Sequence, residues 1–207
     1  MKPNCYIDFD GTLVSNKQRL YQFFIDHIPG EYRGVLSVDA FWELKRQGVH
    51  ELDWLNSQYH LSLDKDQYNE LKKRDIEKPE YLQYEELLPR TIDALIKLRS
   101  KYRIVLVSRR SKPEGLYAEI NRFALQALLD EIHVIPHDGT PKDEYIRKNL
   151  NVSANDMLVG DTEDDIVAGC NLDIKTYMVL SGIRDKWVID KFRLSSVEII
   201  QDVSCIM

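Results

Sequence analysis

The chain alternates short apolar runs with segments of helical periodicity, and this pattern limits its fold more than any other feature. Apolar runs of strand length lie at residues 5–7, 104–107, 132–135, 157–159, 175–180 and 197–200. Strands that alternate with helices form a parallel sheet through right-handed crossovers, and helices cover both faces of such a sheet. The sequence therefore predicts an α/β fold with a Rossmann-like parallel sheet covered by helices.

Residues 15–87 interrupt this alternation, because their periodicity is helical throughout. The predicted helices cover residues 20–28, 38–47 and 51–58, and a fourth, capped by Ser62 or Asp64, extends to Arg74. The alternation resumes at a helix that Pro89 opens as its first residue. We therefore predict a sheet domain made of residues 1–14 and 88–207, with an all-helical domain of residues 15–87 inserted after the first strand.

The stretch Asp8-Phe9-Asp10-Gly11-Thr12 follows the first apolar run and carries two carboxylates two positions apart. In an extended backbone such residues point to the same side, and the glycine then permits a sharp turn. Carboxylates this close repel each other, and a divalent cation that prefers oxygen ligands, such as Mg²⁺, relieves the repulsion. The motif predicts a nucleophile, Asp8, beside a proton-transferring group, Asp10. A strand that ends in a polar turn would show the same residues.

Two later segments supply residue types that bind a phosphoryl group. Ser108 follows the run at 104–107, and its hydroxyl can donate a hydrogen bond to a phosphoryl oxygen. Arg109 and Arg110 come next and either bind a substrate anion or form a solvated basic loop. Lys142 lies at a predicted helix start, where its ammonium can neutralise phosphoryl oxygens and restrain the nucleophile.

The stretch Gly160-Asp161-Thr162-Glu163-Asp164-Asp165 follows another strand and is strongly acidic. Asp161, at the strand end, is a candidate Mg²⁺ ligand, and Asp165 can turn back toward it from the first helical turn. Because the carboxyl ends of parallel strands share one edge of the sheet, we expect all these side chains to gather there. Four separate segments then supply what phosphoryl transfer needs.

These four segments resemble the motifs of the haloacid dehalogenase (HAD) superfamily of phosphohydrolases. The stretch from Asp8 to Leu13 matches the first motif, Ser108 the second, Lys142 the third and the acidic stretch from Gly160 the fourth. The resemblance extends over nearly the whole chain, and the helical insertion resembles a C1-type cap. It implies a Mg²⁺-dependent phosphatase that hydrolyses a small phosphomonoester through an aspartyl-phosphate on Asp8.

The same resemblance implies a role for each site residue. The catalytic set comprises Asp8, Asp10, Ser108 and Lys142. The phosphate-binding set comprises Asp8, Gly11, Thr12, Ser108, Arg109 and Lys142. The metal set for the Mg²⁺ cofactor comprises Asp8, Asp10 through its backbone carbonyl, Asp161 and Asp165. Asp10 is expected to protonate the leaving oxygen and then to activate the water that releases phosphate.

Composition narrows the range of partners. The net charge of −6 argues against binding to nucleic acid or to an anionic membrane. The three cysteines have no metal-ligand spacing and are typical of a reducing compartment. With no signal peptide at Met1 and no membrane-spanning apolar run, we expect a cytoplasmic protein that acts on a small phosphorylated metabolite.

Three alternatives share this framework. A dehalogenase of the same fold uses the first aspartate but not the second, so Asp10 and the acidic fourth motif argue against it. A phosphomutase keeps water away from its aspartyl-phosphate, and the sequence leaves that function open. A non-enzymatic phospho-acceptor module also uses acids, Ser or Thr, and Lys, but its acceptor follows a later strand and it lacks a long insertion. Release of phosphate during turnover separates these classes.

Overall fold

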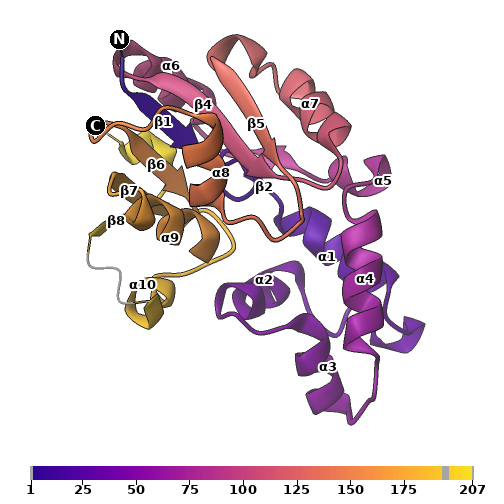
Figure 1. Ribbon diagram of the computed structural model, residues 1–207. Coiled ribbons are helices and arrows are strands. Elements are labelled where there is room, and N and C mark those ends of the chain that lie inside the picture. Colours follow the sequence, from indigo (N-terminus) through magenta and orange to yellow (C-terminus); the bar gives the residue numbers. More distant parts are fainter. Residues whose placement is uncertain (1, 193–195, 207) are drawn as a thin grey trace.

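The computed structural model describes residues 2–192 and 196–206, and its centre is a parallel sheet (Figure 1). Within the described residues this sheet has six strands in the order β5-β4-β1-β6-β7-β8, and every neighbouring pair is parallel. The strands are Asn4–Ile7 (β1), Arg103–Arg109 (β4), Glu131–Ile135 (β5), Met157–Gly160 (β6), Lys175–Val179 (β7) and Val197–Ile200 (β8). The predicted α/β fold is thus confirmed, including its edge strand.

Helices cover both faces of this sheet. They are Thr91–Lys101 (α6), Pro113–Arg122 (α7), Lys142–Asn149 (α8), Glu163–Asn171 (α9) and Trp187–Phe192 (α10). Successive residues of a strand face opposite sides, so Cys5 and Ile7 pack with α6 and α7, whereas Tyr6 packs with α8 and α9. The pattern explains why residues 5–7 of β1, buried on both faces, are apolar without alternation.

One predicted helix start is wrong by two residues. Helix α6 begins at Thr91, not at Pro89, because Arg90 takes a left-handed backbone conformation with a φ of 63°. Thr91 is buried, and its hydroxyl donates to the carbonyl of Leu13 at 3.1 Å. This contact ties the start of α6 to the turn that follows β1.

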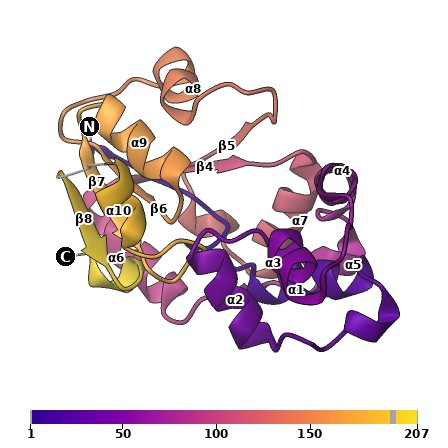
Figure 2. The same cartoon turned by 90° about the horizontal axis from the view of Figure 1, so that it is seen from below.

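The insertion forms a separate group of helices, which Figures 1 and 2 show on the opposite side of the molecule from the two termini. They are Lys17–Asp26 (α1), Val38–Arg46 (α2), Glu51–Tyr59 (α3), Lys65–Asp75 (α4) and Pro79–Leu82 (α5). Their apolar faces share a core of their own, which includes Phe23, Phe24, Phe41, Leu52 and Leu55. The side chain of Asp64 accepts from the N–H of Gln67 and caps α4.

A short antiparallel ladder joins the two places where the chain enters and leaves this group. Val14–Ser15 (β2) pairs with Glu86–Leu87 (β3), and Val14 lies opposite Leu87. The ladder lies next to residues 14 and 88, where the chain is predicted to pass from the sheet domain to the helical group and back. The domain boundaries themselves stay a prediction.

A second junction lies between the end of α2 and the segment that runs from the loop after β7 to the start of α10. Two backbone carbonyls at the end of α2 accept hydrogen bonds: that of Arg46 from Trp187 Nε1 at 2.6 Å, and that of Lys45 from Arg184 Nη1 at 3.1 Å. The last carbonyls of a helix have no partner within it, so these donors complete α2. No helix in residues 2–192 and 196–206 is long and apolar enough to cross a membrane.

Candidate active site

The chain turns sharply at the end of β1, in the middle of the sheet. Asp8 follows β1, and its N–H donates to the carbonyl of Val159 in β6 at 3.0 Å. Gly11 has a φ of 76°, and a Cβ there would lie 2.2 Å from Asp161 Oδ2, so only glycine fits. The strand therefore presents Asp8 at the carboxyl edge of the sheet, and the turn passes directly beside Asp161.

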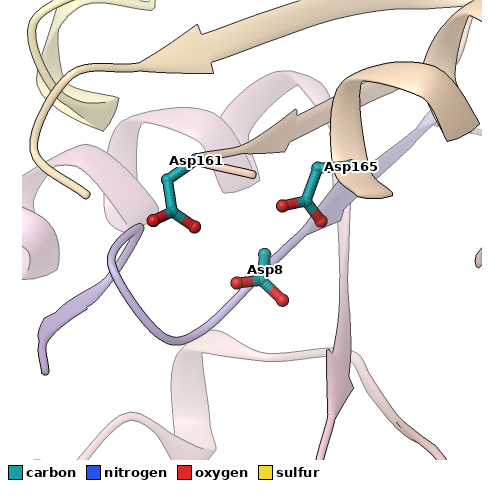
Figure 3. Close-up of side chains that lie close together, drawn as sticks. All are labelled: Asp8, Asp161 and Asp165. Atoms are coloured by element: carbon teal, nitrogen blue, oxygen red, sulfur yellow. The ribbon is translucent and has the colours of Figure 1, made fainter. Parts of the chain in front are cut away.

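Three buried aspartates meet at this edge. Asp8 follows β1, Asp161 follows β6, and Asp165 lies in the first turn of α9. Each offers a carboxylate oxygen within 4.8 Å of the others, and Figure 3 shows the three side chains pointing toward one another. A hard divalent cation such as Mg²⁺ prefers oxygen ligands of this kind.

The surroundings of Asp161 leave one of its oxygens available to a ligand. Oδ2 accepts a hydrogen bond from the N–H of Ile183 at 2.7 Å. Oδ1 is buried and has no hydrogen-bond partner in the described part of the chain. A buried carboxylate oxygen without a partner is costly, and a bound cation would remove that cost. The three aspartates therefore fit a divalent metal ion.

Lys142 supplies positive charge to the cluster. It begins α8 and is 3% exposed. Its ammonium donates to Asp8 Oδ1 at 3.1 Å and to a carboxylate oxygen of Asp165. Burial lowers the pKa of Lys142, but the two carboxylates outweigh burial and raise it, so the side chain stays charged.

The cluster carries more negative than positive charge. Burial raises the pKa of Asp8 to about 7, with Asp165 and Asp10 adding to the rise and Lys142 opposing it. Burial, together with Asp8 and Asp165, also raises the pKa of Asp161 well above its usual range. Three carboxylates against one ammonium leave two excess negative charges when all are ionised, which a divalent cation matches.

The carboxylate of Asp10 lies outside this cluster and pairs with two arginines. Its Oδ1 accepts hydrogen bonds from Arg19 Nη2 at 3.0 Å and from Arg110 Nη2 at 2.9 Å. Its Oδ2 lies 2.8 Å from Arg110 Nε. Burial raises the pKa of Asp10, but the guanidinium groups of Arg110 and Arg19 outweigh burial and lower it. Its backbone carbonyl is then the atom through which Asp10 would bind a metal.

The two arginines belong to a buried network of ionisable side chains. Arg19 Nη1 lies 2.7 Å from Glu85 Oε1, and Arg110 Nη2 lies 2.8 Å from Glu119 Oε2. The sequence predicts only that Arg110 binds an anion or is solvated. No motif predicts a role for Arg19, Glu85 or Glu119. One signal exists: Arg19 precedes Phe23 by four residues, so it shares the apolar face of its helix, where a charge needs a partner.

Ser108, Thr12 and Arg109, the other side chains predicted to bind phosphate, differ in burial and in hydrogen bonding. Ser108 is buried near the end of β4, and the buried hydroxyl of Thr12 has no hydrogen-bond partner among the described residues. Arg109 donates to Asp164 at 3.0 Å and to the carbonyl of Thr140 at 2.9 Å. Its guanidinium thus already bridges the first turn of α9 and the loop before α8. Phosphate binding by these residues stays a prediction.

A cavity of about 380 Å³ opens beside Asp10, between the helical group and the loop after β4. Its lining includes Asp10, Arg19, Lys72, Glu77, Arg110 and His137. A larger cavity of about 1050 Å³ lies near Asn4 and Arg103, at the amino ends of the strands, away from the aspartates. Ligands of parallel sheets gather at the carboxyl ends, so the smaller cavity is the candidate substrate site.

The fold and this cluster define an α/β enzyme with an acidic centre at the carboxyl edge of a parallel sheet. The sequence profile of the family described as haloacid dehalogenase-like hydrolase matches residues 6–179. The chain therefore belongs to the haloacid dehalogenase-like hydrolases, and it is an enzyme.

Solved structures with the same fold cover nearly the whole chain. A haloacid dehalogenase-like family hydrolase from Streptococcus pneumoniae has a TM-score of 0.65 at 17% identity, covering 95% of this chain and 93% of its own. A predicted phosphoglycolate phosphatase from Haemophilus somnus has a TM-score of 0.67 at 17% identity, covering 98% and 95%. A HAD-hydrolase from Bacillus subtilis, solved bound to magnesium, has a TM-score of 0.56 at 17% identity, covering 86% of each chain.

Proposed function

We propose that this hydrolase is a Mg²⁺-dependent phosphatase that releases phosphate from a small phosphomonoester through an aspartyl-phosphate on Asp8. The observation that carries the proposal is the cluster at the sheet edge, where Asp8 meets Lys142, Asp161 and Asp165. A nucleophilic carboxylate beside an ammonium and a set of carboxylates that can hold a cation is the arrangement that phosphoryl transfer to an aspartate requires.

In the first step, a carboxylate oxygen of Asp8 forms a bond to phosphorus while the bond from phosphorus to the ester oxygen breaks. Asp10 gives a proton to the departing oxygen, which leaves as an alcohol. The two guanidinium groups favour the ionised form of Asp10, whereas the negative phosphoryl group of a bound substrate opposes them and favours the protonated carboxyl that this step needs. In the second step, Asp10 takes a proton from a water molecule as that water attacks phosphorus. The bond between Asp8 and phosphorus breaks, and free phosphate and the Asp8 carboxylate result.

The remaining residues of the site bind and orient the phosphoryl group. Lys142 would hold a phosphoryl oxygen while it restrains Asp8, and Ser108 would donate a hydrogen bond to another. When bound, Mg²⁺ would offset the negative charge of the phosphoryl oxygens and of the carboxylates. Asp8, Asp161 and Asp165, with the carbonyl of Asp10, would hold it. The magnesium reported for the Bacillus subtilis relative is consistent with this assignment.

The helical group of residues 15–87 would act as a cap over this site. The candidate cavity lies between this group and the sheet domain, so a substrate bound there would contact both. The phosphoryl group would contact the sheet domain, and the rest of a small phosphorylated metabolite would contact the cap. A cap of this kind excludes bulk water during the reaction.

Phosphate release from a panel of phosphomonoesters, with and without Mg²⁺, tests the function. We expect turnover of at least one ester with Mg²⁺, little with Ca²⁺, whose coordination is longer and more pliable, and none after chelation. Asp8→Asn should reduce turnover below a few per cent of wild type, because an amide is a poor nucleophile. Full activity after exhaustive chelation, or in Asp8→Asn, would contradict the proposal. Transfer of phosphate within one substrate, without release, would indicate a phosphomutase.

A further inference from the structure

The side chain of Asp10 is held more firmly than a surface carboxylate at the end of a strand would be. Two hydrogen bonds reach Oδ1, one from Arg19 and one from Arg110, and Arg110 Nε contacts Oδ2 at 2.8 Å. Arg110 therefore approaches both oxygens of the carboxylate with its planar guanidinium, which fixes the rotation of the carboxylate as well as its place.

Asp10 is the member of this network that is exposed to solvent, and the other side chains of the network are buried. The side chain of Asp10 is 19% exposed and lines the candidate cavity, whereas those of Arg19 and Arg110 are 6% and 1% exposed. The side chains of Glu85 and Glu119, which complete the network, are 0% and 3% exposed. Buried ion networks cost much desolvation and add little net stability, so their best-attested use is to specify one arrangement.

The network also connects Asp10 to both crossings between the sheet domain and the helical group. Arg19 belongs to α1, just after β2, and Glu85 immediately precedes β3. Their side chains meet at 2.7 Å beside Asp10. Arg110 and Glu119 belong to the sheet domain, in the loop after β4 and in α7. Asp10 is thus fixed from both parts of the molecule at once.

We propose that Arg110 and Arg19 are positioning residues that hold the carboxyl group of Asp10 toward the leaving oxygen of the substrate. The inference rests on the proposed function, in which Asp10 protonates that oxygen. Without the two guanidinium groups, the carboxyl group rotates away from the cavity and proton transfer to the leaving group is lost. Nucleophilic attack by Asp8 does not depend on either arginine, because neither contacts the three-aspartate cluster in the described structure.

The dependence of the rate on the leaving group tests this role. p-Nitrophenol departs with little need of a proton, whereas the alkoxide of an alkyl phosphate needs a general acid, whose contribution is about 10²–10⁴-fold. The value of kcat/KM covers the steps up to departure of this group. In Arg110→Lys and Arg19→Met, we expect kcat/KM for an alkyl phosphate to fall at least about tenfold more than kcat/KM for p-nitrophenyl phosphate.

Arg122→Met is the matched control. Arg122 donates to the carbonyl of Glu85 at 2.8 Å and lies 3.9 Å from Glu119, so it touches the same network without contacting Asp10. We expect it to change both esters by the same factor. Circular dichroism shows which variants fold, and Arg19→Lys, which keeps the charge, replaces any variant that does not.

The two possible failures are distinguishable. Equal losses for both esters in the Arg110 and Arg19 variants would overturn the positioning role and leave the proposed phosphatase function intact. Wild-type protein that releases phosphate from no ester in the panel would overturn the proposed function, and the positioning role with it.

Discussion

At the scale of single residues, burial determines the charge of the site. Asp8 is 8% exposed and has Asp165 and Asp10 as acidic neighbours, so its ionised form is disfavoured until a cation is bound. Lys142 offsets this only in part. The residue that the proposed chemistry needs as a carboxylate is therefore destabilising in the metal-free protein, as is common at active sites.

Asp8→Asn should remove this cost. The pKa of Asp8 rises to about 7 in the folded protein, against about 3.9 in an unfolded chain, so the folded state binds the extra proton between these values. The free energy of unfolding of metal-free wild type should fall as pH rises through this window. The fall should be smaller in the Asn variant, which lacks the contribution of Asp8, while burial still raises the pKa of Asp161. Chemical denaturation at several pH values, in the presence of a chelator, measures the difference.

Asp93→Asn is the control for that experiment, because Asp93 is exposed on α6. Its unfolding free energy should follow wild type across the pH range. A constant difference between Asp8→Asn and wild type from pH 4 to pH 8 would show that Asp8 keeps an ordinary pKa.

At the scale of elements, one buried carboxylate joins three helices of the insertion. Glu51, at the start of α3, is buried, and its oxygens accept from Lys45 of α2 at 2.6 Å and from Lys72 of α4 at 2.8 Å. The hydroxyl of Tyr68 donates to it at 3.1 Å. Burial raises the pKa of Glu51, but the two ammonium groups outweigh burial and lower it.

Glu51→Gln should destabilise the protein by about 3 kcal/mol at pH 7, because it leaves two partly buried ammonium groups without their partner. A carboxyl with a lowered folded pKa stabilises above its unfolded pKa, and this contribution is lost as pH falls through the folded value. The difference from wild type should therefore shrink below about pH 4.3. Thermal and urea unfolding measure it, with the exposed Glu43→Gln as control. Equal stability of Glu51→Gln and wild type at pH 7 would show that the Glu51 carboxylate does not stabilise the helical group.

At the scale of the whole molecule, the helical group contacts the loop that holds Asp161. Arg46 Nη1 of α2 donates to the carbonyls of Leu180 and Gly182, both at 2.7 Å. The next residue, Ile183, donates its N–H to Asp161 Oδ2. The position of the helices and the geometry of the proposed metal site are therefore linked through one short loop.

Arg46→Met should weaken Mg²⁺ binding several-fold, because the loop loses two hydrogen bonds and holds Asp161 less firmly. Calorimetric titration of the protein with Mg²⁺ measures the change in Kd independently of activity. Arg33→Met, at an exposed arginine of the same helical group, should leave Kd unchanged. An unchanged Kd in Arg46→Met would show that the loop holds Asp161 without help from the helices.

The parallel sheet and the meeting of Asp8, Lys142, Asp161 and Asp165 could be predicted from residue patterns alone. Apolar runs that alternate with helices permit few topologies, and parallel strands bring their carboxyl ends to one edge wherever they lie in the chain. Local signals were less accurate at α6, where Pro89 was expected at the first position. The left-handed turn at Arg90 depends on where the chain returns from the insertion.

The surroundings of Asp10, in contrast, could not be predicted from residue patterns. Arg19, Glu85, Arg110 and Glu119 come from four segments, and no spacing rule links them. The local sequence around an arginine on a helix is the same whether its side chain is solvated or buried against a carboxylate. Whether such an arginine is solvated or buried depends on how the helical group packs on the sheet domain. Packing brings together residues that are far apart in sequence, and local sequence patterns do not describe such contacts.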